Sequence, residues 1–227
     1  MPVTLHVWRV PRRSIGAAML RMAFTPRKLP FAKFLGTAYG FRPLDADLSR
    51  YAAVTVSDEP VTFPGWDRLA VARARVDLEP LHSRGTWSGH TPFVPSGAKP
   101  DGMILALTRA RLRPSKALTF WRAIPPVIGE LDGAPGLLAQ FGIGEAPIGW
   151  QGTVSVWRDA ADLVRFAYRQ PEHRAVIART PTDRWYAEEL FARFAVRGIT
   201  GDRSVLGWLP GAVLPGEGAV SPKEGGR

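Results

Sequence analysis

The sequence LHVWRV at residues 5–10 leads into a stretch with helical spacing at residues 14–23, and the same pair of features returns about 100 residues later. The second copy is ILALTRA at residues 104–110, followed by apolar residues spaced for one helix face at residues 114–130. Short runs that are alternating or continuously apolar predict strands, and apolar residues every three to four positions predict helices. Each half of the chain is therefore expected to begin with a strand and a helix.

The remaining features recur in the same order. Each half has a second strand that contains glycine, a third strand that runs into a helix at an Asp-containing turn, and a closing phrase with an Arg-Gly pair. The matched stretches are residues 34–37 with 141–144, 51–57 with 152–157, the turns near Asp67 and Asp159, and residues 83–86 with 196–199. Each half is thus predicted to be β-α-β-β-α-β, the ferredoxin-like arrangement.

A single ferredoxin-like unit leaves one apolar face of its sheet bare, and that face has to be buried. Two tandem copies can cover each other, so the prediction is an α+β fold in which two ferredoxin-like repeats form a fused dimeric α/β barrel. The repeats are assigned to residues 1–97 and 98–209, and residues 210–227, which lack an apolar period, to a disordered tail. The alternative is a coincidence between unrelated strands and helices, but the shared order and closing phrase favour a repeat.

The composition restricts the chemistry. The chain has 227 residues, 45% hydrophobic and 22% charged, which is typical of a soluble globular protein. It has no cysteine, which excludes disulfides, zinc–thiolate sites, iron–sulfur clusters and a thiolate-ligated haem. Any metal or haem would need nitrogen or oxygen ligands, and the four histidines are His6, His82, His90 and His173.

The net charge is +10, but the basic residues are scattered and no nucleic-acid-binding motif surrounds them. We therefore expect no nucleic-acid partner. A solvated basic surface is the first explanation of the charge, and weak attraction to anionic lipid is the second. No segment has the form of a signal peptide or the length of a membrane-spanning helix, so the expectation is a cytoplasmic protein with at most a peripheral contact with the membrane.

One histidine has a setting suited to a metal. The stretch WRDAADLVRFAYRQPEHRAVIAR at residues 157–179 predicts the end of a strand, a helix and then, after a Pro-Glu pair, His173 at the start of another helical turn. A neutral imidazole on a helix beside an apolar sheet face can hold one axial position of a haem iron. A surface or capping histidine is the other reading of the same local pattern.

Several short motifs, in matching order from Leu5 to Gly201, resemble the spheroidene monooxygenase family. They are RGTWSGHTPF at residues 84–93, LTRA at 107–110, FWR at 120–122, GIGEAP at 142–147, the alternating Gln151, Thr153, Ser155 and Trp157, and WYAEELFARF at 185–194. The resemblance is carried by separate motifs with similar spacing over nearly the whole chain except its tail.

The resemblance implies a monooxygenase that depends on haem b, and therefore on iron. Its substrate would be a long apolar molecule, an acyclic carotenoid of the spheroidene type, which it would convert to a ketone with electrons from a ferredoxin or similar donor. It also implies the dimeric α/β barrel superfamily, in which haem-degrading monooxygenases carry an iron-ligating histidine late in a helix. His173 is the residue that falls there in this sequence.

Further candidate site residues are Glu145, Arg84, Arg197 and Trp87. Glu145 could relay protons to bound dioxygen, or it could cap a turn. Arg84 and Arg197 could pair with haem propionates, or they could lie in solvent or in surface salt bridges. Trp87 offers flat apolar surface for a porphyrin or polyene, although a tryptophan can equally be plain core. Among the histidines, His90 in its Gly-flanked turn is the main rival of His173.

Two other functions remain open at this stage. The first is a haem enzyme of the same fold that acts on a small molecule, with peroxidase-like or dehydratase-like chemistry. The second is a protein without catalytic activity that binds haem or a lipophile, since the fold alone does not decide the function.

Overall fold

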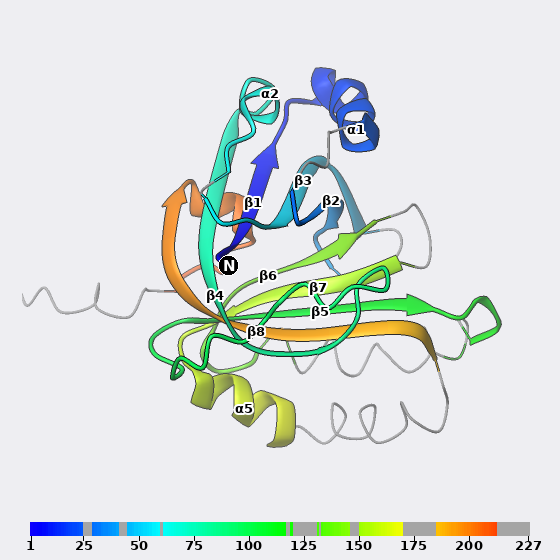
Figure 1. Ribbon diagram of the computed structural model, residues 1–227. Helices are drawn as coiled ribbons and strands as arrows, with labels where there is room; N and C mark the ends of the chain where they lie inside the picture. Colours follow the sequence, from blue (N-terminus) through cyan, green and yellow to red (C-terminus); the bar gives the residue numbers. More distant parts are fainter. Residues whose placement is uncertain are drawn as a thin grey trace, which may run out of the picture.

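The strands form a closed barrel in the computed structural model (Figure 1). The structure describes residues 1–24, 29–40, 45–59, 61–116, 119, 131, 133–145, 150–169 and 185–212. The strands are β1 (Val3–Arg9), β2 (Phe31–Ala38), β3 (Ala46–Val56), β4 (Ala72–Gly85), β5 (Ile104–Leu112), β6 (Leu137–Gly144), β7 (Trp150–Trp157) and β8 (Tyr186–Gly201). The α-helices of the described residues are α1 (Ile15–Phe24), α2 (Pro64–Asp67) and α5 (Ala160–Arg169).

The order of the strands around the barrel confirms the predicted fold. The barrel runs β1-β3-β2-β6-β7-β5-β8-β4. The first half thus contributes the order β4-β1-β3-β2 and the second half the same order, β8-β5-β7-β6. This is the strand order of a ferredoxin-like sheet, repeated. The two sheets join through the pairs β2·β6 and β4·β8, and the predicted boundary between residues 97 and 98 lies in the connection from β4 to β5.

A glycine ends each of the two strands that join the sheets along β4·β8. Gly85 ends β4 with φ 92°, and Gly201 ends β8 with φ 89°. After each glycine, the next amide donates to a carbonyl of the partner strand: Thr86 to Glu189 and Asp202 to Arg73, both at 2.8 Å. The structure therefore matches Gly85 with Gly201, and the sequence match of Gly85 with Gly198 is wrong by three residues. The positive φ and the equivalent hydrogen bond fix the true match.

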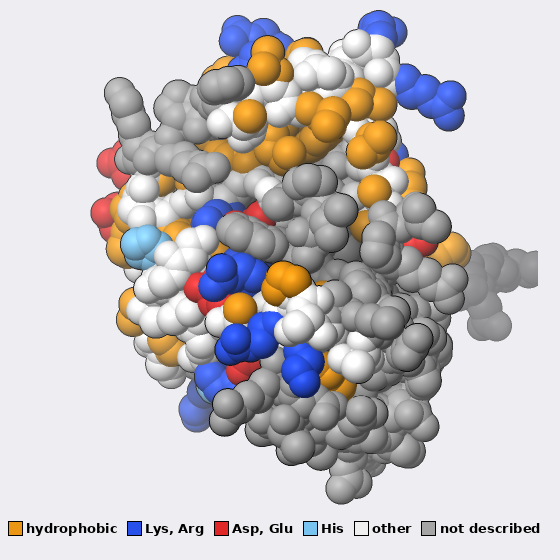
Figure 2. All heavy atoms as spheres, turned by 90° about the vertical axis from the view of Figure 1, so that its right-hand side faces the viewer, with side chains coloured by type: hydrophobic (Ala, Val, Ile, Leu, Met, Phe, Trp, Pro, Cys, Tyr) orange, Lys and Arg blue, Asp and Glu red, His pale blue; other side chains and the backbone are white. Residues whose placement is uncertain are grey.

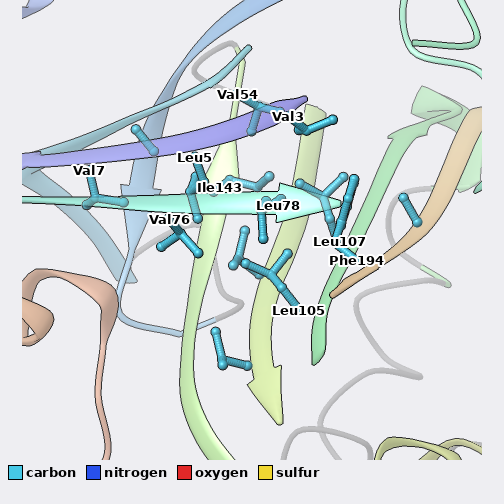
Figure 3. Packing of buried hydrophobic residues seen from close by; sticks show 14 of the residues in the cluster. Val3, Leu5, Val7, Val54, Val76, Leu78, Leu105, Leu107, Ile143 and Phe194 are labelled. Carbon is cyan, nitrogen blue, oxygen red and sulfur yellow. The ribbon is translucent and has the colours of Figure 1, made fainter. Parts of the chain in front are cut away.

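Apolar side chains fill the inside of the barrel. Alternate residues of a strand point to the same side of the sheet, and on β1 the inward residues Val3, Leu5 and Val7 are all at most 1% exposed. Figure 3 shows them converging with inward residues of the other strands, among them Leu105 and Phe194. The interior is thus the main core of the protein and not an open channel.

Helices cover the outer faces of the two sheets. In the first half, α1 and α2 lie over a cluster that includes Trp8, Ala18 and Trp66. In the second half, α5 packs Leu163 and Phe166 against the sheet. In Figure 1 these helices lie on opposite sides of the barrel, with α1 and α2 at the top and α5 at the bottom. The described helices are all too short or too polar to span a bilayer.

Some predicted features lie outside the described residues. These are most of the predicted helix at residues 114–130, of which the short 3-10 turn Pro114–Lys116 and Thr119 are described, and residues 213–227 of the predicted tail. The first residues of that tail are ordered, and Ala212 packs against the barrel core. The indole of Trp208 donates to the carbonyl of Ala212 at 3.0 Å, and the amide of Ala212 donates to the carbonyl of Leu209 at 3.1 Å.

The glycines that end β4 and β8 give a test of the internal symmetry. A Cβ at Gly85 would lie 2.1 Å from the carbonyl oxygen of Glu189, and a Cβ at Gly201 would lie 2.3 Å from that of Arg73. We expect Gly85→Ala and Gly201→Ala each to lower the free energy of unfolding by roughly 2–4 kcal/mol in urea titrations, because left-handed strain adds to a backbone clash. Gly97→Ala is the control, since Gly97 has φ 79° but open space around it. If Gly97→Ala lowered the free energy of unfolding as much as the other two variants, the backbone clash could not be the cause of their loss.

Candidate functional site

The outer face of the second sheet has a floor of small side chains. Inward residues of β5, β6 and β7, such as Leu107, Phe141 and Val154, belong to the barrel core, so their neighbours face outward. The floor consists of Ala106, Thr108 and Ala110 on β5, Thr153 and Ser155 on β7, and Gly144 on β6. Gly142, next to it on β6, is covered by the backbone of Gly40, whose carbonyl oxygen would lie 2.7 Å from a Cβ there. In one row across the three strands, Gly142 pairs with Thr153, and Thr153 pairs with Thr108. The two threonine hydroxyls are 2.5 Å apart and hydrogen-bonded.

Helix α5 and Trp157 form a wall at one end of this floor. Trp157 is 1% exposed, donates its indole N–H to Ser155 Oγ at 2.9 Å, and lies 5.2 Å from the ring of Phe166. The start of α5 is fixed by Asp159, whose carboxylate accepts from the amide of Asp162 at 2.8 Å, an N-terminal cap. The predicted helix after the strand end at Trp157 is confirmed. His173, four residues beyond α5 in the sequence, lies outside the described residues.

Arg84 borders the floor, whereas Arg197 does not. The row of the floor that contains Thr108 continues to Phe191 on β8 and to Arg84 on β4. The Arg84 guanidinium lies 5.1 Å from the ring centre of Phe191 and 3.6 Å from Glu189, and its side chain is 67% exposed. Arg197 lies six residues beyond Phe191 on β8, which is about 20 Å away at strand spacing. It pairs with Glu79 at 2.5 Å. The structure therefore separates the two arginines that the sequence suggested as propionate partners.

A cluster of charged residues lies on the other side of the same sheet, inside one end of the barrel. Arg109 follows the inward residues Leu105 and Leu107 on β5, and its side chain is 3% exposed. Its Nε donates to Glu145 at 3.0 Å, and its Nη1 donates to Glu188. Lys33 completes the cluster from β2, with its Nζ 3.2 Å from Glu145. The cations of Lys33 and Arg109 thus lie against the carboxylates of Glu145 and Glu188 in a mostly buried place.

The chain brings Trp87 and Glu145 together, as members of this cluster. Trp87 is fully buried in the barrel core and donates its indole N–H to Glu145. It begins a tight turn in which Ser88 and Gly89 have φ 53° and 78°, and its amide donates to the carbonyl of His90 at 2.8 Å. The described partners of Glu145 are all donors, from Lys33, Trp87 and Arg109. This arrangement suits a carboxylate that holds the turn over the end of the barrel.

Glu188 ties the turn to β8. Burial raises the pKa of Glu188, but hydrogen bonds from the Gly89 amide and from Arg109, together with the Arg109 charge, lower it to about 2. The amide of Gly89 donates to Glu188 at 2.8 Å and the hydroxyl of Thr86 at 3.1 Å. Because the pKa lies below its ordinary value of 4.5, Glu188 stabilises the fold above that pH, and this stabilisation is lost as the pH falls toward 2.

Sequence reasoning missed Lys33, Arg109 and Glu188 as members of one cluster. Each stands in a strand at a position whose neighbours two residues away face the core, as in FAKFL at residues 31–35. A charge at an inward position of an alternating strand is the signal that could have identified them. Only the register of the barrel, however, brings β2, β5 and β8 together at one end.

The described histidines do not form a metal site. No group of three or more metal-binding side chains occurs among the described residues. His82 and His90 are exposed. His6 points to the outer face of the first sheet, as the alternation of β1 predicts, and is 7% exposed. Its ring stacks on Trp8 at 5.4 Å and meets Phe63 edge-on at 5.1 Å, a position within a packed aromatic cluster.

Relatives of this chain carry the name spheroidene monooxygenase. The chain is 36% identical to that of Rhodobacter capsulatus over 150 residues, 63% of this chain and 62% of the relative. It is 34% identical to that of Rubrivivax gelatinosus over 182 residues, 75% of this chain and 70% of the relative, and 31% identical to that of Cereibacter sphaeroides over 193 residues, 76% and 58%. The chain thus spans less than two thirds of the length of two of these relatives. No protein-family profile matches it.

Solved structures support the fold. An aldoxime dehydratase has a TM-score of 0.51 at 11% identity and covers 86% of this chain and 80% of its own. Aldoxime dehydratase OxdRE in complex with butyraldoxime also has a TM-score of 0.51, at 8% identity, and covers 86% of this chain and 79% of its own. At such identities the likeness concerns the fold alone.

We expect the substitution Arg109→Met to destabilise the protein strongly. It leaves the buried carboxylates of Glu145 and Glu188 without their guanidinium, which costs roughly 3–5 kcal/mol in the free energy of unfolding. Adding Glu145→Gln and Glu188→Gln should restore part of that loss in urea unfolding. Arg73→Met is the control, because Arg73 pairs with Asp67 on the surface and is 58% exposed, and should cost less than about 1 kcal/mol. Equal losses for Arg73→Met and Arg109→Met would contradict the importance of the cluster.

His6 gives a prediction for pH. Burial, followed by the charge of Arg75, lowers the pKa of His6 from 6.5 to about 4. The unfolded chain therefore binds a proton at this position below pH 6.5 while the folded protein does not, so stability should fall by roughly 3 kcal/mol between pH 6.5 and pH 4. His6→Phe keeps an aromatic ring and should flatten the stability profile in this window, measured by urea unfolding at each pH. His82→Phe, at an exposed histidine, should leave the profile unchanged. If both variants gave the same profile, His6 would not be the group responsible for the loss of stability in this window.

Proposed function

Because the chain belongs to the spheroidene monooxygenase family, we propose that it inserts oxygen into a long apolar substrate, an acyclic carotenoid of the spheroidene type, and yields a ketone. The observation that supports this is the identity to three relatives of that name. Their alignments of 150 to 193 residues are longer than either half of the barrel, so each includes residues of both halves. The relationship therefore extends into both halves of the fused barrel.

The reaction needs electrons from outside the chain. Each hydroxylation of a methylene group places one atom of dioxygen in the substrate and reduces the other to water, which requires two electrons and two protons. A second hydroxylation at the same carbon followed by loss of water gives the ketone. The sequence has no dinucleotide-binding fingerprint, so we assign the supply of electrons to a ferredoxin or a similar donor.

The floor on the outer face of the second sheet fits a haem. Small side chains such as Ala106 and Thr108 let a flat macrocycle approach the sheet, the apolar cluster of α5 over the buried Trp157 borders it, and the exposed guanidinium of Arg84 at the edge suits a propionate. A haem bound here would supply the redox-active iron that activates dioxygen. In this proposal His173 would hold the haem iron, on the strength of the resemblance and of the absence of cysteine.

The substrate is proposed to lie on the same outer face. The inside of the barrel is filled by buried side chains (Figure 3), which leaves a long polyene no comparable space there. Trp157 and the helix that covers it would exclude water from the reacting carbon. Glu145 faces the interior of the barrel, on the other side of the sheet, so we assign it to holding the strand ends and not to delivering protons to the floor.

The test combines haem binding with turnover. The purified chain, supplied with haem, should show a Soret band, and with reduced ferredoxin, dioxygen and spheroidene it should form a ketone whose longer conjugation shifts absorption to the red. His173→Ala should lose or weaken the Soret band and abolish turnover, because the imidazole is removed while alanine preserves a helix. His90→Ala, at an exposed histidine in a turn, is the matched control and should retain both.

Three results would overturn parts of this proposal. An unchanged Soret band in His173→Ala would refute the ligand. A Soret band without turnover of any acyclic carotenoid, together with turnover of a small aldoxime or peroxide, would favour a haem enzyme with another substrate. If the chain forms the ketone without any Soret band, haem is refuted as the cofactor, but the proposed reaction is not.

A further inference from the structure

Helix α1 is apolar on two sides. Its inner side packs on the barrel through Ala18, which is fully buried, with Ile15 and Met22 beside it. Its outer side presents Met19, 48% exposed, and the adjacent Leu20, 62% exposed. A helix that covers a barrel normally carries polar residues on its outer side, so the outer side of α1 has the character of a second contact surface.

The surroundings of this surface are basic. Arg12 and Arg13, in the 3-10 turn Arg12–Ser14 that leads into α1, are exposed, and neither has an ion pair within the described part of the chain. Figure 2 shows hydrophobic side chains gathered at the top of this face, where α1 lies, with Lys and Arg side chains at the margins. The surface therefore combines protruding apolar side chains with a rim of positive charge.

The sequence concentrates its charge in this region. The first 44 residues contain eight Lys and Arg and no Asp or Glu, and the first acidic residue is Asp45. The other 183 residues contain 22 Lys and Arg and 20 Asp and Glu, so they are almost neutral. Nearly the whole net charge of +10 thus comes from the segment that contains α1. Arg9 and Lys33 of this segment are held in ion pairs with Asp47 and Glu145, but Arg12 and Arg13 project outward.

We propose that α1 docks this protein on the surface of an anionic lipid bilayer. Met19 and Leu20 would enter the boundary between headgroups and acyl chains, and Arg12 and Arg13 would lie among the anionic headgroups, as in helices that lie in the membrane interface. The surface carries the opposite charge to such a membrane, which is the complementarity that selects this partner. The helix is short, so binding should be reversible and sensitive to salt.

Charge also argues against a second copy of the chain as the partner. A symmetric contact through α1 would bring two sets of arginines face to face and leave their repulsion uncompensated. The inference does not depend on the proposed reaction, because α1 lies on the opposite side of the barrel from α5 (Figure 1). It concerns attachment of the protein to the membrane and not the path of a substrate.

Vesicle flotation with the full chain tests the proposal. Vesicles of phosphatidylcholine with 30% phosphatidylglycerol (a composition of the order used to model anionic membranes) should bind the chain at least tenfold more strongly than vesicles of phosphatidylcholine alone. Added salt should release it. Met19→Ser/Leu20→Ser and Arg12→Gln/Arg13→Gln should each reduce binding about tenfold.

Matched controls remove the same kinds of side chain elsewhere. Val94→Ser/Val164→Ser replaces residues that are 77% and 42% exposed, away from α1, and Lys99→Gln/Lys116→Gln removes two exposed charges. Both control variants should retain binding within about twofold. Equal losses in the α1 variants and the controls would show that overall charge or hydrophobicity is responsible, and would overturn the proposal.

A fluorescent probe gives a second readout that does not depend on loss of binding. Because the chain has no cysteine, Leu20→Cys creates a single thiol for an environment-sensitive dye. The dye should shift to the blue on anionic vesicles, whereas a dye at Val164→Cys on α5 should not. The absence of a shift at position 20, an oligomer that dissociates in Met19→Ser/Leu20→Ser, or α1-dependent binding to duplex DNA without vesicle binding would each overturn the membrane as partner.

Discussion

Closure of the barrel depends on the pairing of β4 with β8. The other junction between the halves is short: among the described residues, Gly36 to Ala38 of β2 are the ones that pair with β6. The β4·β8 ladder runs from the pair Ala74–Gly201 to the pair Gly85–Leu190, and so spans nearly the whole length of both strands. Each ferredoxin-like sheet has an apolar inner face, and exposure of that face to water would be unfavourable. This ladder holds the two faces against each other. At each of its ends, a glycine lets the chain turn out of the ladder where the backbone of the partner strand lies close by.

The internal repeat and most of its strands could be predicted from the sequence, because strand alternation and helical spacing are local properties. The sequence around Arg197 and Gly198 resembles the sequence around Arg84 and Gly85. Because of this likeness, the sequence match between the two repeats is wrong by three residues at this point. What defines the end of β8 is the backbone angle at Gly201 and the hydrogen bond that follows it. Neither can be read from residue types alone.

The candidate site was predicted less completely, and for a physical reason. Glu145 and Trp87 were identified, but their relation to each other and to Arg109 depends on which strands meet across the barrel end. Sequence spacing says nothing about a contact between residues 58 positions apart in different repeats. The same holds for Arg84, whose neighbour Phe191 comes from the other half of the chain.

The alternation of β5 connects the two sides of the second sheet. Arg109 is fixed inside the barrel by two carboxylates, and its neighbours Thr108 and Ala110 belong to the outer floor. A strand held at one residue by a buried guanidinium has little freedom to shift or twist at the adjacent residues. The charged cluster can therefore fix the position of the floor residues from the opposite side of the sheet. On this reasoning the cluster supports the outer face that is proposed above as the binding face, and its buried charges serve the position of β5 as well as the stability of the fold.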